Sequence, residues 1–174
     1  MSDIHIRPGV EEDVPVILEL IHALAEYEKV RPEEAPVDQA VLRESLFGAR
    51  PAAEVLLAEV EGETAGLALF FHNFSTWQGR RGLYLEDLFV RPAMRGRGIG
   101  KALLCELARI ATERGCARME WAVLDWNTPS IEFYRSLGAV PMDEWTIFRL
   151  TAPAIERLAG RRSGVRQMRY SLTK

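Results

Sequence analysis

A glycine-rich turn between two regular elements does most to constrain how this 174-residue chain folds. Residues 83–90 form a hydrophobic run of strand length, and residues 99–110 carry apolar side chains at helical spacing. The segment Arg95-Gly96-Arg97-Gly98-Ile99-Gly100 joins the two. A strand that enters a short turn and a helix that leaves it are typical of folds that combine a sheet with helices.

Periodicity and capping residues predict further elements on both sides of this turn. Strands are expected at 4–6, 54–61, 64–74, 83–90, 117–124 and 145–150, with weaker signals near Val140 and at 165–172. Helices are expected from about 11 to 30, from the cap Asp38 to Gly48, and at 99–115, 127–137 and 151–158. This order predicts an α/β (α+β) fold in which a mixed sheet has helices on both faces.

The composition is that of one globular domain, with 48% hydrophobic and 27% charged residues. A continuous apolar run of about 18 residues, which a membrane span needs, is absent from the sequence. The first residues lack the layout of a signal peptide. Two separate cysteines and three scattered histidines do not form metal-ligand spacings. We therefore expect a single cytoplasmic domain over residues 1–174, without a metal, that ends in a basic tail at 160–174.

Three phosphate-binding patterns compete for residues 95–100. A Walker loop needs a glycine where Arg95 stands and a hydroxyl where Ala102 stands. A dinucleotide fingerprint starting at the first glycine would need a third glycine in place of Lys101. The remaining pattern, Arg-x-x-Gly-x-Gly, fits the turn, so nucleotide hydrolysis and hydride transfer are disfavoured.

The physical basis of such a turn is shared by all phosphate-binding loops. Glycines leave room for phosphate oxygens to reach backbone N–H groups, and the following helix presents its free N–H groups and positive dipole end. Arg95, Arg97 and Lys101 add positive charge. A plain tight turn with incidental arginines is the alternative, but the strand before it and the helix inside it favour a pyrophosphate site.

Motifs on either side of the turn point to one family. They are Leu85-Glu86-Asp87-Leu88-Phe89-Val90, Asn127-Thr128-Pro129-Ser130 and Phe133-Tyr134. With the turn, they resemble the GNAT N-acetyltransferase superfamily over nearly the whole chain. Ala25-Glu26-Tyr27-Glu28 and residues 126–131 look most similar to its spermidine/spermine (diamine) and thialysine branch. The resemblance implies a mostly antiparallel sheet of about six to seven strands, with one parallel pair that splays apart.

The resemblance also implies acetyl-CoA as the cofactor and a site made of three segments. Its residues would be Leu88, Phe89, Val90, Arg95, Gly96, Arg97, Gly98, Ile99, Gly100, Lys101, Asn127, Ser130 and Tyr134. The strand would present backbone groups to the pantetheine arm, much as a sheet edge binds a peptide. The turn would hold the pyrophosphate.

An amine attacks a thioester only when it is neutral, which at pH 7 holds for about one primary amine in a thousand. The resemblance implies Glu86 as the base, either directly or through a water chain. Neighbours on a strand point to opposite faces unless a bulge intervenes, so Glu86 and Asp87 are expected to differ in orientation. Tyr134 is implied as the acid that protonates the departing thiolate.

Tyr27, Glu28, Glu86 and Asp87 are the candidate binding residues for the acceptor amine. Carboxylates and an aromatic face suit an ammonium group. Residues 11–38 hold nine acids against two basic residues, which either attracts a cationic substrate or forms a solvated helix face. Partners expected are a small amine and a second copy of the chain, with neither nucleic acid nor membrane.

The sequence thus predicts transfer of acetyl to a primary amine of a small cation, such as a polyamine, diamine or thialysine-like molecule, by direct attack in a ternary complex. A cysteine route is disfavoured because Cys105, between Leu104 and Leu107, is expected in the core, and Cys116 has no histidine nearby in the sequence. The alternatives are an acetyltransferase for protein or amino-acid amines and a non-catalytic acyl-CoA sensor.

Overall fold

The computed structural model describes residues 3–31, 34 and 36–160, so the expected strand at 165–172 and nearly all of the basic tail lie outside the described residues. The chain divides into two compact units, Met1–Asp125 and Trp126–Lys174. The first unit holds the sheet and the glycine turn. The second holds helices α4 (Thr128–Ser136) and α5 (Ala152–Gly160).

The sheet of the first unit has five strands in the order β1-β2-β3-β4-β5. They are β1 (Ile4–Pro8), β2 (Glu54–Val60), β3 (Glu63–Ser75), β4 (Arg80–Val90) and β5 (Met119–Trp121). The first four pair antiparallel in sequence order, whereas β5 runs parallel to β4. The predicted mixed sheet with one parallel pair is confirmed, although its strand count is five rather than six or seven.

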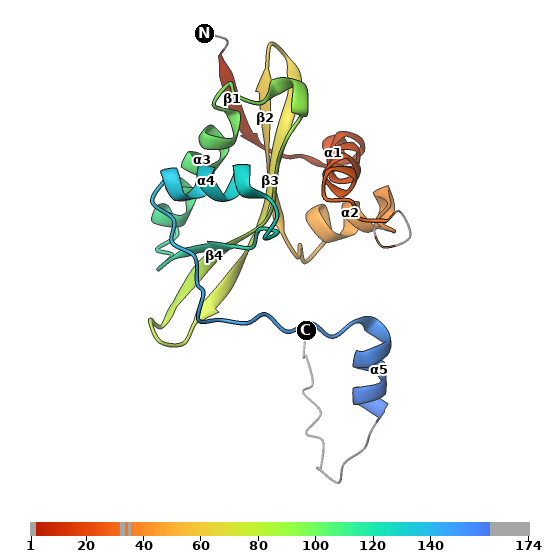
Figure 1. Cartoon of the computed structure of the whole chain (residues 1–174). Coiled ribbons are helices and arrows are strands. Elements are labelled where there is room, and N and C mark those ends of the chain that lie inside the picture. Colours follow the sequence, from red (N-terminus) through yellow and green to blue (C-terminus); the bar gives the residue numbers. More distant parts are fainter. Residues whose placement is uncertain (1–2, 32–33, 35, 161–174) are drawn as a thin grey trace. The chain divides into compact units, whose positions relative to one another are not determined.

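Helices cover both faces of this sheet, as predicted. Helices α1 (Val14–Tyr27) and α2 (Gln39–Phe47) lie on one face and α3 (Ile99–Glu113) lies on the other (Figure 1). The backbone N–H of Val41 donates to Oδ1 of Asp38 at 2.8 Å, which confirms Asp38 as the cap of α2. The central strands β2 and β3 are therefore covered on both sides, and most of their residues are apolar.

The core beneath α1 and α2 follows the two-residue period of the strands. Its buried members are Val14, Ile17, Leu20, Leu24, Leu42, Leu46, Val55, Leu57, Leu67 and Phe89. The intervening residues of β2, Leu56 and Ala58, point to the opposite face, where Leu103 and Leu107 of α3 are fully buried. The face to which a β4 side chain points therefore decides which helices it can meet.

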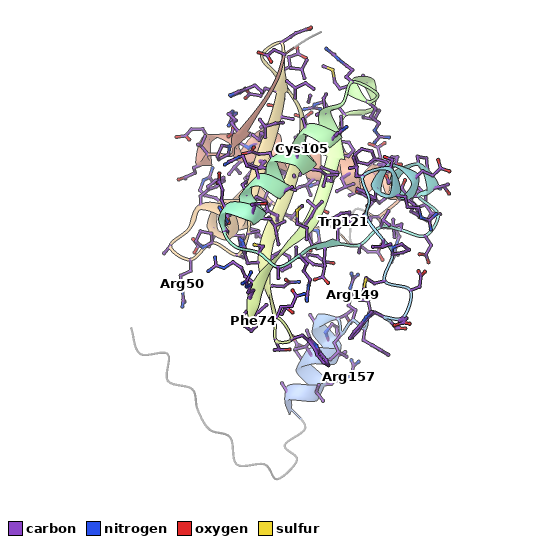
Figure 2. All side chains as sticks on the ribbon, turned by 90° about the vertical axis from the view of Figure 1, so that its left-hand side faces the viewer. Arg50, Phe74, Cys105, Trp121, Arg149 and Arg157 are labelled. Atoms are coloured by element: carbon purple, nitrogen blue, oxygen red, sulfur yellow. The ribbon has the colours of Figure 1, made fainter. Side chains whose placement is uncertain are left out.

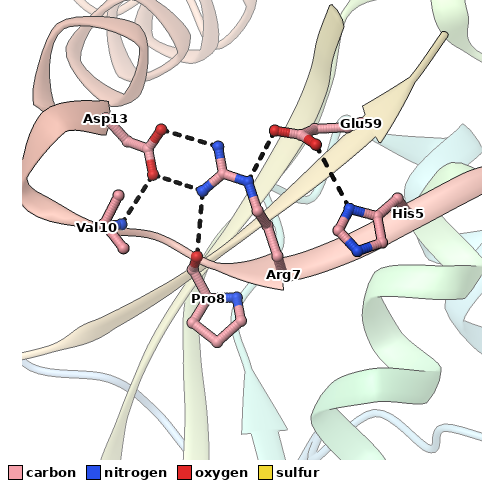
Figure 3. A network of polar contacts seen from close by, with 6 residues as sticks. All are labelled: His5, Arg7, Pro8, Val10, Asp13 and Glu59. Atoms are coloured by element: carbon pink, nitrogen blue, oxygen red, sulfur yellow. Dashed lines mark hydrogen bonds and ion pairs between the residues drawn. The ribbon is translucent and has the colours of Figure 1, made fainter. Parts of the chain in front are cut away.

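An ion-pair network ties β1 to the start of α1 (Figure 3). The Arg7 guanidinium donates to both carboxylate oxygens of Asp13, at 2.6 and 2.9 Å, and to Oε1 of Glu59 on β2 at 2.7 Å. The backbone N–H of Val10 also donates to Asp13, at 2.8 Å. The bond from Arg7 is the main cause that lowers the pKa of Asp13. The network fixes the direction in which α1 leaves the sheet, and so the position of its C-terminal end.

Three strand predictions were wrong in extent or altogether. Strand β5 covers three residues rather than 117–124, and neither 145–150 nor the surroundings of Val140 are strand. The side chains of Trp145 and Phe148 are 69% and 92% exposed. The apolar pattern at 145–150 satisfies the local requirement for a strand, but a strand also needs a neighbour for its backbone N–H and C=O groups. Within the described residues, that segment pairs with none.

Candidate acetyl-transfer site

A β-bulge at Glu86 interrupts the pairing of β4 with β3 before the last residues of β4. Across the β3–β4 pair, Leu69 lies opposite Asp87 and Phe70 lies opposite Leu85, so Glu86 is the extra residue. Asp87 consequently shares a face with Leu69, which packs on the core beneath α1. Glu86 itself is exposed. The bulge therefore turns Asp87 toward the α1 side and leaves its neighbour in solvent.

Acidic side chains gather around Asp87. Burial, followed by the negative charges of Glu86 and Glu28, raises the pKa of Asp87 to about 6. Glu28, the cap residue at the C-terminal end of α1, is partly buried, which raises its own pKa. Three of the four residues predicted to bind the acceptor are thus brought within electrostatic reach of one another. Because like charges repel there, a cation is the ligand that this cluster favours.

Tyr27, the fourth of these residues, contacts the turn. The Arg95 guanidinium carbon lies 4.4 Å from the centre of the Tyr27 ring and 5.8 Å from that of Phe89. Nε of Arg95 also donates to the carbonyl of Val90 at 3.1 Å. Arg95 therefore links the end of α1, the end of β4 and the glycine turn.

The turn has the backbone that its glycines predict. Gly96 and Gly98 have φ values of 76° and 85°, and a Cβ at either position would lie more than 4 Å from other heavy atoms. Gly98 is the N-cap of α3 and has no side chain to cap the helix, so the first N–H groups of α3 lack the usual local acceptor. Ile99, 1% exposed, anchors the helix. These features fit a pyrophosphate, with Lys101 exposed beside it.

The parallel pairing of β4 with β5 stops at Leu85, in the middle of β4. Its register couples Leu83 with Met119, Tyr84 with Glu120 and Leu85 with Trp121. β4 continues to Val90, whereas β5 ends at Trp121. Within the described residues, the backbone of 88–90 therefore has no strand neighbour on that side. An extended chain carrying amide groups, such as pantetheine, fits an edge of this kind.

The second unit carries the remaining candidates on one helix. The backbone N–H of Ser130 donates to Oδ1 of Asn127 at 3.4 Å, so Asn127, only 6% exposed, caps α4. Ser130 and Tyr134 follow at spacings of three and seven residues, which places both on the helix face of Asn127. The rings of Phe133 and Tyr134 lie 5.4 Å apart between centres. The side chains of Asn127, Ser130 and Tyr134 thus lie on one side of α4.

Cys105 is exposed on α3 and is not a core residue, which corrects the sequence-based expectation (Figure 2). It lies halfway between Leu103 and Leu107, the positions that pack on the sheet, so it points outward. Helical spacing alone could have shown this. Cys105 and the Asp87 cluster therefore lie on opposite faces of the sheet.

Within residues 3–31, 34 and 36–160, no group of three or more His, Cys, Asp or Glu side chains is placed to hold a metal ion. Nor does that part of the chain contain a helix long and apolar enough to cross a membrane.

Comparison with known sequences identifies the family. The profile of the Acetyltransferase (GNAT) family matches residues 18–139. The chain belongs to this family. It is 38% identical over 172 residues to the thialysine N-epsilon-acetyltransferase of Bos taurus, covering 92% of this chain and all of that one. It is 30% identical over 198 residues to the L-ornithine N5-acetyltransferase of Arabidopsis thaliana, covering 88% and 86%.

Two further comparisons support the branch and the fold. A spermidine/spermine N(1)-acetyltransferase-like protein of Homo sapiens is 35% identical over 159 residues, which are 86% of this chain and 23% of that one. An integron cassette protein of V. cholerae superposes with a TM-score of 0.75 at 25% identity, covering 90% and 98%. The GNAT protein is therefore an acetyltransferase, and the resemblance to the thialysine and spermidine/spermine branch is confirmed.

Proposed function

We propose that this GNAT enzyme transfers acetyl from acetyl-CoA to a primary amine of a small cation by direct attack in a ternary complex. The acidic cluster around Asp87 carries this proposal, because it lies on the strand that leads into the glycine turn. A donor held by the turn and a cation held by the cluster would meet on β4. Relatives named for thialysine and ornithine, both of which carry amines, support this substrate class.

Acetyl-CoA, when bound, would supply the thioester carbonyl that the amine attacks. Residues 95–101 would hold its pyrophosphate through backbone N–H groups and cationic side chains. The free edge of residues 88–90 would align the pantetheine amides. Asn127 and Ser130 are proposed to contact the same arm.

The proton of the ammonium is proposed to go to Asp87. A carboxylate with a pKa of about 6 is largely ionised at pH 7.5, yet it is more basic than an ordinary aspartate. Glu86, the base that the family resemblance implies, is exposed at the bulge and would relay the proton through water. Glu28 and Tyr27 would hold the remainder of the cationic substrate.

Tyr134 is proposed to protonate the departing thiolate. Tyr134→Phe keeps the ring but loses the hydroxyl proton, so kcat should fall about a hundredfold while acetyl-CoA affinity changes little. Steady-state kinetics and calorimetry measure the two effects separately. Phe133→Leu, which alters only the neighbouring ring, is the control and should keep most of the turnover. Unchanged kcat in Tyr134→Phe would remove the acid role.

A panel of amines tests the proposed substrate class. We expect kcat/KM to be highest for spermidine and a short diamine, lower for thialysine, ornithine and lysine, and lowest for a lysine-containing peptide. Net cationic molecules gain most from the Asp87 cluster, whereas a peptide backbone gains nothing from it. A peptide that ranks first would favour the alternative of a protein acetyltransferase.

We further propose that the enzyme acts in the cytoplasm as a homodimer. Five large apolar side chains within residues 140–148 are more than half exposed, a density that isolated soluble chains rarely keep. They are Val140, Met142, Trp145, Ile147 and Phe148. Sedimentation equilibrium should give twice the mass of one chain. A single-chain mass at micromolar concentration would contradict the dimer.

A further inference from the structure

A second candidate binding site lies at the other end of β4. An open hollow of about 590 Å³ is found at the β3–β4 hairpin, where Figure 2 shows Phe74 at the end of β3. Its lining residues are His72, Phe74, Gly79, Arg80, Arg81, Arg114 and Gly115. Arg80 begins the eleven-residue strand whose far end leads into the glycine turn. At about 3.3 Å per residue, roughly 30 Å separates the hollow from that turn.

The strand register places three side chains of this hollow on one face of the sheet, whereas Arg80, opposite Ser75, begins β4 on the other face. Phe74 lies opposite Arg81 and His72 lies opposite Leu83, so His72, Phe74 and Arg81 share a single face. It is the face covered by α3, whose C-cap residue is Arg114. The guanidinium carbon of Arg114 lies 5.9 Å from the centre of the Phe70 ring. Residues from β3, β4 and α3 therefore converge on one space.

Positive charge predominates in this hollow. Arg114 donates to both carboxylate oxygens of Glu54, at 2.5 and 2.8 Å, which fixes its guanidinium. Within the described residues, Arg80 and Arg81 form no ion pair. Three arginines thus line the hollow, and the carboxylates of Glu54 and Glu113 both act on Arg114. Arg80 and Arg81 keep free donors in the planar geometry that matches phosphate oxygens.

His72 adds an uncharged polar group. Burial, followed by the positive charges of Arg114 and Arg81, lowers the pKa of His72 against the opposing effect of Glu54. The imidazole is therefore neutral at pH 7. Among the described residues, its buried Nε2 has no hydrogen-bond partner. A neutral imidazole adds no charge, so the positive charge of the hollow comes from its arginines.

We propose that this hollow binds a small molecule carrying two or more phosphoryl groups, at a site separate from that of acetyl-CoA. Arg80 and Arg81 neutralise the phosphoryl oxygens, and Arg114 with His72 closes the inner side. Phe74, 63% exposed at the rim, offers an aromatic face to an attached organic group. Inorganic polyphosphate and a nucleoside triphosphate share the chemistry that this site recognises.

Calorimetry of the full chain saturated with CoA tests the site, because CoA occupies the proposed cofactor turn. Tripolyphosphate and ATP should each bind, with an affinity that falls as salt is raised. The double variant Arg80→Ala/Arg81→Ala should weaken binding at least about tenfold, since it removes both unpaired guanidinium groups. The control Arg43→Ala/Arg50→Ala removes the same charge from exposed positions outside the lining of the hollow and should change affinity less than about twofold.

The two ligands also distinguish the sources of the phosphoryl groups. Equal affinities would identify inorganic polyphosphate as sufficient, whereas tighter ATP binding that Phe74→Ala removes would identify a nucleotide. Thermal unfolding of each variant checks that its fold is intact. The proposal is overturned if neither ligand binds the CoA-saturated protein, or if the control variant loses as much affinity as Arg80→Ala/Arg81→Ala. Neither result depends on acetyl transfer.

Discussion

Gly98→Val is expected to raise the dissociation constant for acetyl-CoA at least about a hundredfold, as measured by calorimetry. Gly98 has a φ of 85° and open space where a side chain would project. A valine there would place two methyl groups where phosphate oxygens must reach the first N–H groups of α3. It would also strain the backbone, because β-branched residues rarely adopt positive φ. Both effects weaken the binding of acetyl-CoA.

Gly79→Val separates these two effects. Gly79, in the β3–β4 turn, has a φ of 61° and equally open surroundings, and it lies at the opposite end of β4 from the glycine turn. The control should lose comparable stability on thermal unfolding and still bind acetyl-CoA normally. Normal affinity in Gly98→Val, or an equal loss in Gly79→Val, would show that the pyrophosphate is not bound at this turn.

Asp87→Asn is expected to lower kcat/KM at pH 7.5 by a factor on the order of a hundred to a thousand. The amide has nearly the same shape as the carboxylate but cannot accept the proton. In the native enzyme, kcat/KM should rise with pH through an apparent pKa near 6 and then level off, because only ionised Asp87 acts as a base. The variant should lack this rise.

Glu86→Gln is the matched variant, since it removes the same charge from the adjacent residue. The charge of Glu86 contributes to the raised pKa of Asp87, so its loss should move the rise to lower pH and leave it intact. If the rise disappears in Glu86→Gln and survives in Asp87→Asn, the base is Glu86 and our assignment is wrong.

Asp87 should also lower the stability of the enzyme above pH 6. Its folded-state pKa exceeds its ordinary value of 3.8, so the folded protein holds this proton more tightly than the unfolded chain. The free energy of unfolding should therefore fall as pH rises from about 4 to 6. Asp87→Asn should unfold at a higher temperature than the native enzyme at pH 8, and at a similar one near pH 3.5.

Local sequence was sufficient to predict most of the fold. The cap Asp38 depends on a few neighbouring residues and was confirmed. The left-handed Gly98 and the cap Asn127 are equally local features. The extent of β5 and the state of 145–150 depend on which strands pair. An apolar pattern cannot supply that information, because it describes one strand and not its neighbour.

The candidate site also combines features set by local sequence with features set by strand pairing. The spacing of its glycines was enough to predict the turn, whereas the orientation of Asp87 depends on the β-bulge at Glu86. That bulge exists only in the register between β3 and β4, which are far apart in the sequence at this point. The basic hollow likewise joins β3, β4 and α3. Arg80 and Arg81 did not predict this hollow from the sequence, because it forms only where they lie near Arg114 in the folded chain.

The central claim is that the chain transfers acetyl from acetyl-CoA to a small cationic amine. Its most direct test combines free-thiol release with mass spectrometry of the amine, using the full chain, acetyl-CoA and either thialysine or spermidine. We expect one N-acetylated amine for each CoA thiol released, and no thiol release when the amine is omitted. Acetyl-CoA binding without amine-dependent thiol release, for any amine of the panel, would contradict it and identify a non-catalytic acyl-CoA sensor.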